Sequence, residues 1–173
     1  MSNYKNKLKH INTFIFDYDG VLTNGTVILQ NDGDALRTAN VKDGYALQLA
    51  IKLGFNVAII SGGNSDSMKK RFETLNIKDF FLGVDNKVVV LTKYLEEKGT
   101  KPENTLYMGD DIPDYKPMKI VGLACCPADA VPEIKGISEY ISIKEGGSGC
   151  VRDIIEQTLK VQEKWMTEDG FKW

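Results

Sequence analysis

Histidine is almost missing from this sequence: the only one among its 173 residues is His10, in a polar N-terminal stretch. Its scarcity excludes phosphohistidine chemistry, a Ser-His-Asp triad and a histidine-rich metal site. Cysteine is also scarce, and Cys125, Cys126 and Cys150 form no CxxC pair. We therefore expect reduced thiols without a catalytic role, and acidic residues must carry the chemistry.

Long apolar runs and a strong excess of one charge are missing as well. Only six apolar or neutral residues, 11–16, separate the basic start of the chain from Asp17, too few for a signal-peptide core or a membrane span. A net charge of -2 provides no basic surface for nucleic acid. We expect a cytoplasmic protein with a small-molecule partner, no nucleic-acid partner and no membrane contact.

Short apolar segments of strand length alternate along the chain with segments of helical periodicity. The helical segments contain Tyr45, Leu49 and Leu53, then Met68 and Phe72, and then residues 89–95. The strand-like segments are residues 11–16, 55–60, 79–82, 105–108, 121–125 and 140–143. This alternation predicts an α/β fold with a doubly wound, Rossmann-like and mainly parallel sheet.

One insertion interrupts the pattern after the first strand. Residues 26–30 and 35–40 flank a turn-forming Asn-Asp-Gly-Asp stretch and predict a β-hairpin flap over about residues 24–40. The later connections are too short for a cap domain. We expect a single domain over residues 1–164 and an aromatic C-terminal tail over residues 165–173.

Acidic residues gather where predicted strands end. Asp17 and Asp19 directly follow the first apolar strand, and a carboxylate in such a place needs compensation for lost hydration, usually a hard cation. Ser61, Lys87 and Asp110 follow later strands. Because carboxyl ends of parallel strands meet at one edge of a sheet, these groups are predicted to form one site.

These residue types match the needs of phosphoryl transfer. Asp17 is the candidate nucleophile, and Asp19 is the candidate acid that protonates the leaving oxygen and then activates water. Ser61 and Lys87 are assigned to the phosphoryl oxygens. Asp17, Asp110 and the backbone carbonyl of Asp19 are the predicted Mg²⁺ ligands. Two further acidic residues are expected just behind these ligands: Asp111 and Asp114.

The segment FDYDGVLT resembles motif one of the haloacid dehalogenase (HAD) superfamily of aspartate-nucleophile phosphatases. Four further segments are similar to the capless 3-deoxy-D-manno-octulosonate 8-phosphate (KDO 8-phosphate) phosphatases: residues 40–45, 109–114, 129–132 and 146–153. The resemblance covers roughly residues 11–156. It implies Mg²⁺-dependent hydrolysis of a sugar acid phosphate, the supply of KDO for lipopolysaccharide, and a homotetramer in which flaps meet and a neighbouring subunit covers each site.

The resemblance also implies a set of substrate-contacting positions. By matching position, these are Asp19, Asn40, Val41, Lys42, Asp43, Gly44, Gly62, Arg71 and Lys87. A sugar acid phosphate carries a phosphate and a carboxylate, so Arg71 and Lys87 supply cations beside the metal.

Three departures from the family leave the substrate open. Gly63 and Ser148 stand where many members carry arginine, and Gln48 replaces another common arginine. With fewer cationic contacts to the sugar carboxylate, the nine-carbon 2-keto-3-deoxynononate 9-phosphate is an alternative substrate.

Two alternatives come from other functional classes. A receiver-type signalling domain uses the same residue types, but it has its acidic pair on the first strand and its phosphate acceptor in mid-chain, the reverse of the order found here. A non-catalytic HAD-like oligomerisation or regulatory module is the other alternative. The intact Asp17 and Asp19 argue against such a module.

Overall fold

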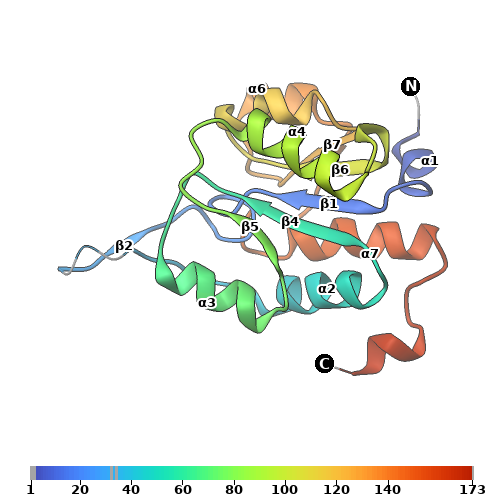
Figure 1. Cartoon of the computed structure of the whole chain (residues 1–173), viewed down its shortest axis with the longest axis horizontal. Coiled ribbons are helices and arrows are strands. Elements are labelled where there is room, and N and C mark those ends of the chain that lie inside the picture. Colours follow the sequence, from blue (N-terminus) through green and yellow to red (C-terminus); the bar gives the residue numbers. More distant parts are fainter. Residues whose placement is uncertain (1–2, 32, 34, 173) are drawn as a thin grey trace.

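A six-stranded sheet forms the centre of the structure (Figure 1). The computed structural model describes residues 3–31, 33 and 35–172. Every neighbouring pair of strands in this sheet is parallel. In spatial order the strands are β5 (Asp79–Phe81), β4 (Asn56–Ile60), β1 (Thr13–Phe16), β6 (Thr105–Met108), β7 (Leu123–Cys126) and β8 (Tyr140–Ile141). The predicted doubly wound α/β fold is confirmed.

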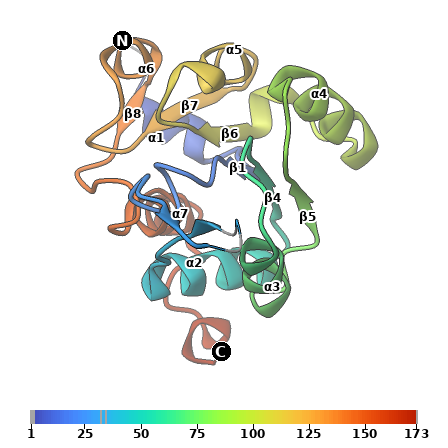
Figure 2. The same cartoon turned by 90° about the vertical axis from the view of Figure 1, so that its left-hand side faces the viewer.

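Helices cover both faces of the sheet, as the end-on view in Figure 2 shows. The described residues contain no cap domain, and none of their helices combines the length and apolar character needed to cross a membrane. One face carries α2 (Val41–Lys52), α3 (Asp66–Thr74) and α7 (Cys150–Val161), with the short α1 (Tyr4–Leu8) beside α7. The other carries α4 (Lys87–Lys98), α5 (Tyr115–Met118) and α6 (Pro132–Ile137). Short 3₁₀ turns lie at Pro102–Asn104, Ile112–Asp114 and Glu168–Phe171.

The central strand β1 is buried on both faces. Phe14 and Phe16 pack into the layer formed with α2, α3 and α7, whereas Ile15 packs into the layer formed with α4, α5 and α6. This alternation follows from the two-residue repeat of a strand, and two-sided burial is the usual state of strands in parallel sheets. Asp17 is therefore attached to one of the best-anchored segments of the fold.

The flap consists of β2 (Ile28–Leu29) and β3 (Ala35–Leu36), which pair antiparallel with Ile28 opposite Leu36. It projects from the body beside the carboxyl ends of the strands, at the left of Figure 1. The predicted hairpin is confirmed, although its paired part is shorter than the apolar pattern suggested. Asp32 and Asp34 of the predicted turn lie outside the described residues.

The end of the chain folds back onto α2 and α7. The Arg152 guanidinium lies 5.4 Å from the Tyr45 ring centre and 5.1 Å from the Trp165 ring centre. The Tyr45 hydroxyl donates a hydrogen bond to the carbonyl of Gly170. Figure 1 shows this segment at the end of α2 away from the flap. The described part of the tail therefore lies far from the carboxyl ends of the strands.

The buried side chain of Asp43 joins α2 to the start of α7. Its Oδ1 accepts a hydrogen bond of 2.7 Å from the backbone N–H of Arg152, at a helix start where Gly149 provides no side-chain cap. Its Oδ2 is buried without a partner among the described residues. Burial is the main cause that raises the pKa of Asp43 to about 6, although the helix-end N–H groups oppose it.

We predict that the free energy of unfolding depends on pH through Asp43. Because its folded pKa lies above the unfolded value, its contribution is present at low pH and is lost as pH rises through about 6. Between pH 4.5 and 7.5 the wild type should lose about 2 kcal/mol relative to Asp43→Asn. Urea unfolding of both proteins at several pH values measures this difference. Parallel pH curves for the two proteins would contradict the assignment.

Candidate active site

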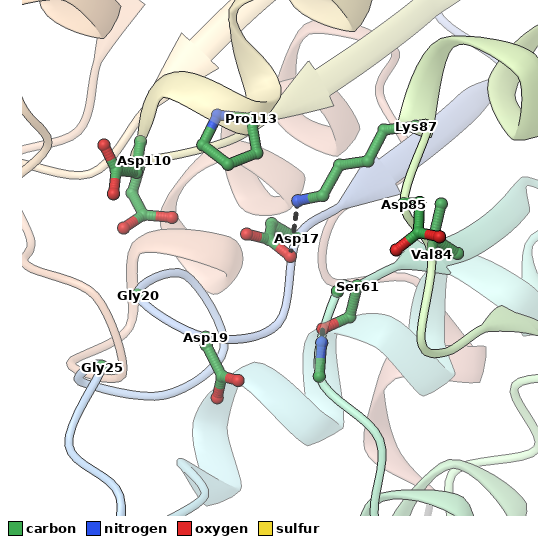
Figure 3. Close-up of a pocket in the computed structure, with 13 residues that line it drawn as sticks. Asp17, Asp19, Gly20, Gly25, Ser61, Val84, Asp85, Lys87, Asp110 and Pro113 are labelled. Carbon is green, nitrogen blue, oxygen red and sulfur yellow. Dashed lines mark hydrogen bonds and ion pairs between the residues drawn. The ribbon is translucent and has the colours of Figure 1, made fainter.

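The carboxyl ends of β1, β4 and β6 open into a pocket of about 530 Å³ (Figure 3). The strand order reverses at β1, which is the place where open α/β sheets bind ligands. The structure brings together at this pocket Asp17, Asp19, Ser61, Gly62, Gly63, Lys87, Asp110 and Asp111.

Lys87 links two buried carboxylates at the base of the pocket. Its Nζ lies 3.0 Å from Asp17 Oδ1 and 2.7 Å from Asp114 Oδ1. Figure 3 marks the ion pair with Asp17. Burial alone would lower the pKa of Lys87, but the two carboxylates raise it above its usual value. Lys87 is therefore an ammonium at neutral pH.

The position of Lys87 follows from the local sequence. The Asn86 side chain accepts hydrogen bonds from the backbone N–H groups of Val88 and Val89, so α4 begins at Lys87. Asp114 lies in the 3₁₀ turn after β6 and also accepts a hydrogen bond of 2.8 Å from the Tyr107 hydroxyl. The lysine thus joins the start of α4 to the ends of β1 and β6.

Asp17 is held by fixed donors. Lys87 and the backbone N–H of Tyr18 both contact its Oδ1, the latter at 2.7 Å. Burial raises the pKa of Asp17 well above its usual value, the nearby Asp114 carboxylate adds to the increase, and Lys87 opposes it. One ammonium therefore does not offset the negative charge gathered here.

The same carboxylates fit a magnesium ion. Asp17, Asp110 and Asp114 each offer an oxygen, and these oxygens lie within 4.8 Å of one another. Asp110 Oδ1 is buried and has no partner among the described residues. Burial, followed by the charges of Asp114 and Asp111, raises the pKa of Asp110 to about 7. A hard cation satisfies an unpaired carboxylate oxygen of this kind.

The geometry distinguishes the roles of the acidic residues around this cluster. Both oxygens of Asp114 already contact donors of the chain, Oδ1 those of Lys87 and Tyr107 and Oδ2 the backbone N–H of Asp110 at 3.4 Å, whereas Asp110 Oδ1 has no partner among the described residues. The carboxylate of Asp19 is outside the cluster, so only its backbone carbonyl could take part. The exposed Asp111 caps the following turn by accepting a hydrogen bond from Ile112 N.

Gly20 makes the close approach of the first loop to Asp110 possible. Its φ is +86°, and a Cβ at this position would lie 2.0 Å from Asp110 Oδ2. A side chain would therefore displace the carboxylate, and the backbone conformation itself favours glycine. The glycine in the DYDG segment thus brings the two acidic loops together.

Sequence reasoning missed Arg37, which follows β3 of the flap. Its Nε lies 2.6 Å from Asp19 Oδ1 and its Nη2 lies 3.0 Å from Asp19 Oδ2. Figure 3 shows the Asp19 carboxylate directed away from Asp17. The one available signal was that Arg37 is the only basic residue in the 24–40 segment. Nothing in the local pattern shows that the flap lies over the acidic loop.

Six of the predicted substrate residues lie outside the acidic pocket of this chain. Asn40, Gly44 and Arg71 line a separate, much smaller pocket, together with Tyr18 and Phe72. Val41 and Lys42 are exposed on the first turn of α2, whereas Asp43 is buried against α7. Ser61 and Gly62 lie at the acidic pocket, where the Ser61 hydroxyl accepts a hydrogen bond of 3.1 Å from Gly63 N.

The three cysteines are free and buried. Burial raises the pKa of each thiol above its usual value. None of them lines the acidic pocket. These thiols are therefore packing groups, in agreement with the expectation of reduced cysteines.

No protein-family model matches the sequence, but curated proteins and solved structures do. The chain is 36% identical over 158 residues to the KDO 8-phosphate phosphatase KdsC of Escherichia coli K12, which covers 91% of this chain and 84% of that protein. Identity to KdsC of Yersinia pestis is 34% over 155 residues, covering 90% of this chain and 83% of that protein.

Two crystal structures are similar over nearly the whole chain. The KDO 8-phosphate phosphatase of Yersinia pestis has a TM-score of 0.92 at 32% identity, covering 94% of this chain and 88% of that one. The enzyme of Moraxella catarrhalis, solved with a magnesium ion, a phosphate ion and KDO, has a TM-score of 0.91 at 32% identity, covering 95% of each chain.

We predict that Mg²⁺ stabilises the protein through Asp110. Because the metal must displace a proton from a carboxyl whose pKa is about 7, the rise in Tm on adding Mg²⁺ should grow from pH 6 to pH 8. At 100-fold excess over Kd, binding stabilises by about 2.7 kcal/mol. Thermal unfolding with and without Mg²⁺ measures this. Asp110→Asn should lose the effect, and the control Asp66→Asn, at the exposed start of α3, should keep it. An unchanged Mg²⁺ response in Asp110→Asn would exclude Asp110 as a ligand.

Proposed function

The chain belongs to the KDO 8-phosphate phosphatase family of the HAD superfamily, and on this premise we propose that it hydrolyses KDO 8-phosphate to KDO and phosphate with Mg²⁺. The observation that carries the proposal is the pocket itself. A buried carboxylate, Asp17, lies there between the ammonium of Lys87 and the unpaired oxygen of Asp110. Phosphoryl transfer needs a nucleophile, a cation and a metal site in this arrangement.

The reaction proceeds in two displacements at phosphorus. Asp17 attacks the phosphorus, the bond to the sugar oxygen breaks, and Asp19 gives that oxygen its proton. Water then attacks the aspartyl phosphate, Asp19 takes the proton of the water, and Asp17 is regenerated. Asp17, Asp110 and the backbone carbonyl of Asp19 would hold Mg²⁺, which would supply positive charge beside the phosphoryl oxygens.

Fixed groups of the chain orient the nucleophile and the phosphoryl group. Because the Tyr18 N–H and Lys87 bind one oxygen of Asp17, the carboxylate cannot rotate freely. The Ser61 hydroxyl and the Lys87 ammonium line the same pocket and are the donors for phosphoryl oxygens. Such preorganised donors lower the barrier because they do not have to reorient during the reaction.

The size of the sugar acid is the open part of the proposal. Gly63 lines the pocket without a side chain, so this position supplies no cationic contact to the sugar carboxylate. The nine-carbon 2-keto-3-deoxynononate 9-phosphate therefore remains the alternative substrate. Comparing kcat/KM for both esters with Mg²⁺ decides between them. Absence of phosphate release from either would favour the non-catalytic module.

We also propose a homotetramer in which a neighbouring subunit covers each site, acting in the cytoplasm to supply lipopolysaccharide synthesis. The flap supports this assembly because four of its apolar residues face solvent, with Leu29 83% exposed. Exposed apolar patches of this kind mark protein contacts. The four residues are Val27, Ile28, Leu29 and Leu36.

We predict that Asp17→Asn abolishes turnover, because an amide is a poor nucleophile. The loss in kcat should be on the order of 100-fold or more, measured as phosphate release with Mg²⁺. Asp66→Asn, on the exposed start of α3, is the matched control and should keep full activity. Retention of more than about one per cent of activity in Asp17→Asn would rule out this nucleophile.

We predict that Leu29→Lys prevents the flaps from meeting and reduces the mass of the particle in solution. A buried lysine at an apolar contact is costly, so the assembly should dissociate. Light scattering after size exclusion measures the mass. Phe171→Lys is the matched control, since Phe171 is 64% exposed and belongs to the C-terminal segment, which lies at the end of α2 away from the flap. An unchanged mass for Leu29→Lys would contradict assembly through the flap.

A further inference from the structure

We propose that Arg37 determines specificity by binding the carboxylate of the sugar acid, and that this contact frees Asp19 for proton transfer. The proposal rests on the proposed function and adds a role that the sequence did not suggest. It assigns the flap a direct contact with substrate. It also means that Asp19 becomes available as the acid only when the substrate carries a carboxylate.

The contact between Arg37 and Asp19 is a two-point ion pair. Two nitrogens of the guanidinium contact the two carboxylate oxygens, at 2.6 and 3.0 Å. The Arg37 side chain is only 8% exposed, and its Nη1 also donates to the carbonyl of Ala35 at 2.8 Å. Arginine is suited to this geometry because its planar fork matches the two oxygens of a carboxylate.

This pair holds Asp19 in an unproductive orientation. Both oxygens of Asp19 contact Arg37, and Oδ1 also accepts a hydrogen bond of 3.4 Å from the Thr23 hydroxyl. Figure 3 shows the carboxylate directed away from Asp17. A general acid must place an oxygen beside the leaving group, next to the phosphorus that Asp17 attacks. Arg37 must therefore release Asp19 before the acid can act.

The substrate carries the group that can replace Asp19 on Arg37. A sugar acid phosphate has a carboxylate at the opposite end from its phosphate, and that carboxylate offers the same two-oxygen geometry. The phosphate itself is matched by other groups, Lys87 and Ser61. An exchange of one carboxylate for another keeps the Arg37 guanidinium paired, so it is not left as an uncompensated buried charge.

Gly63 provides the space for this arrangement. A Cβ at position 63 would lie 2.8 Å from Asp19 Oδ2 and 3.1 Å from Arg37 Nη2. Even a methyl group would therefore push the ion pair apart. Substitutions at Gly63 and at Arg37 are therefore expected to be energetically coupled.

The test compares two phosphate esters that differ in the carboxylate. We expect Arg37→Ala to lower kcat/KM for KDO 8-phosphate by about 10- to 100-fold, the effect of losing a charged two-point contact. For arabinose 5-phosphate, which lacks a carboxylate, kcat should be unchanged or higher because Asp19 is released. Arg37→Lys keeps the charge without the fork and should fall between wild type and Arg37→Ala. Equal losses on both esters, or no loss on either, would overturn the proposal.

Two further variants separate specificity from folding of the flap. Thr38→Ala, at the exposed next residue, should behave as wild type on both esters. Gly63→Ala should reproduce the selective loss, and the double variant with Arg37→Ala should be no worse than either single variant. Additive losses would overturn the coupling. Hydrolysis of KDO 8-phosphate by the wild type tests the proposed function separately. If the wild type is active and Arg37→Ala keeps the wild-type preference between the two esters, only the role of Arg37 is refuted.

Discussion

The buried ion pairs of Lys87 are the interaction on which the rest of the site depends. Its side chain is only 5% exposed and lies between Asp17 and Asp114. Charges are rarely removed from water to this degree unless they are paired, and loss of one partner leaves an uncompensated buried charge. These contacts tie the first residue of α4 to the ends of β1 and β6. The site therefore forms only when both halves of the sheet are in place around β1.

The ammonium of Lys87 leaves the acidic cluster short of positive charge. Asp17, Asp110 and Asp114 face a single lysine, and burial raises the pKa of Asp110 to about 7. A divalent cation and a bound phosphate change this balance together, because the metal supplies charge that the phosphate then partly neutralises. The folded chain alone therefore has too little positive charge at this cluster, and Mg²⁺ supplies it. The unfavourable free energy of burying these carboxylates is offset when Mg²⁺ and substrate bind.

Much of this architecture was predictable because local patterns specify it. The apolar strand of residues 105–108 and the chain turn after Asp17 depend on neighbours in sequence, and β6 has the predicted bounds. The helix α7 was not predicted, although Val151, Ile154, Ile155 and Leu159 have the spacing of a helix with one buried face. Arg37 was missed for a different reason: its partner Asp19 is distant in sequence and meets it only when the flap folds. Contacts of this kind depend on tertiary structure, which a single sequence does not display.

The central claim is that Asp17 forms a covalent bond to phosphorus. The most direct measurement is acid quenching of the enzyme during turnover of KDO 8-phosphate with Mg²⁺, followed by borohydride reduction and peptide mass spectrometry. An aspartyl phosphate is reduced to homoserine, so the account predicts this conversion at Asp17 and at no other carboxylate. Conversion at Asp19 or Asp110, or continued phosphate release with Asp17 unmodified at every quench time, would contradict it.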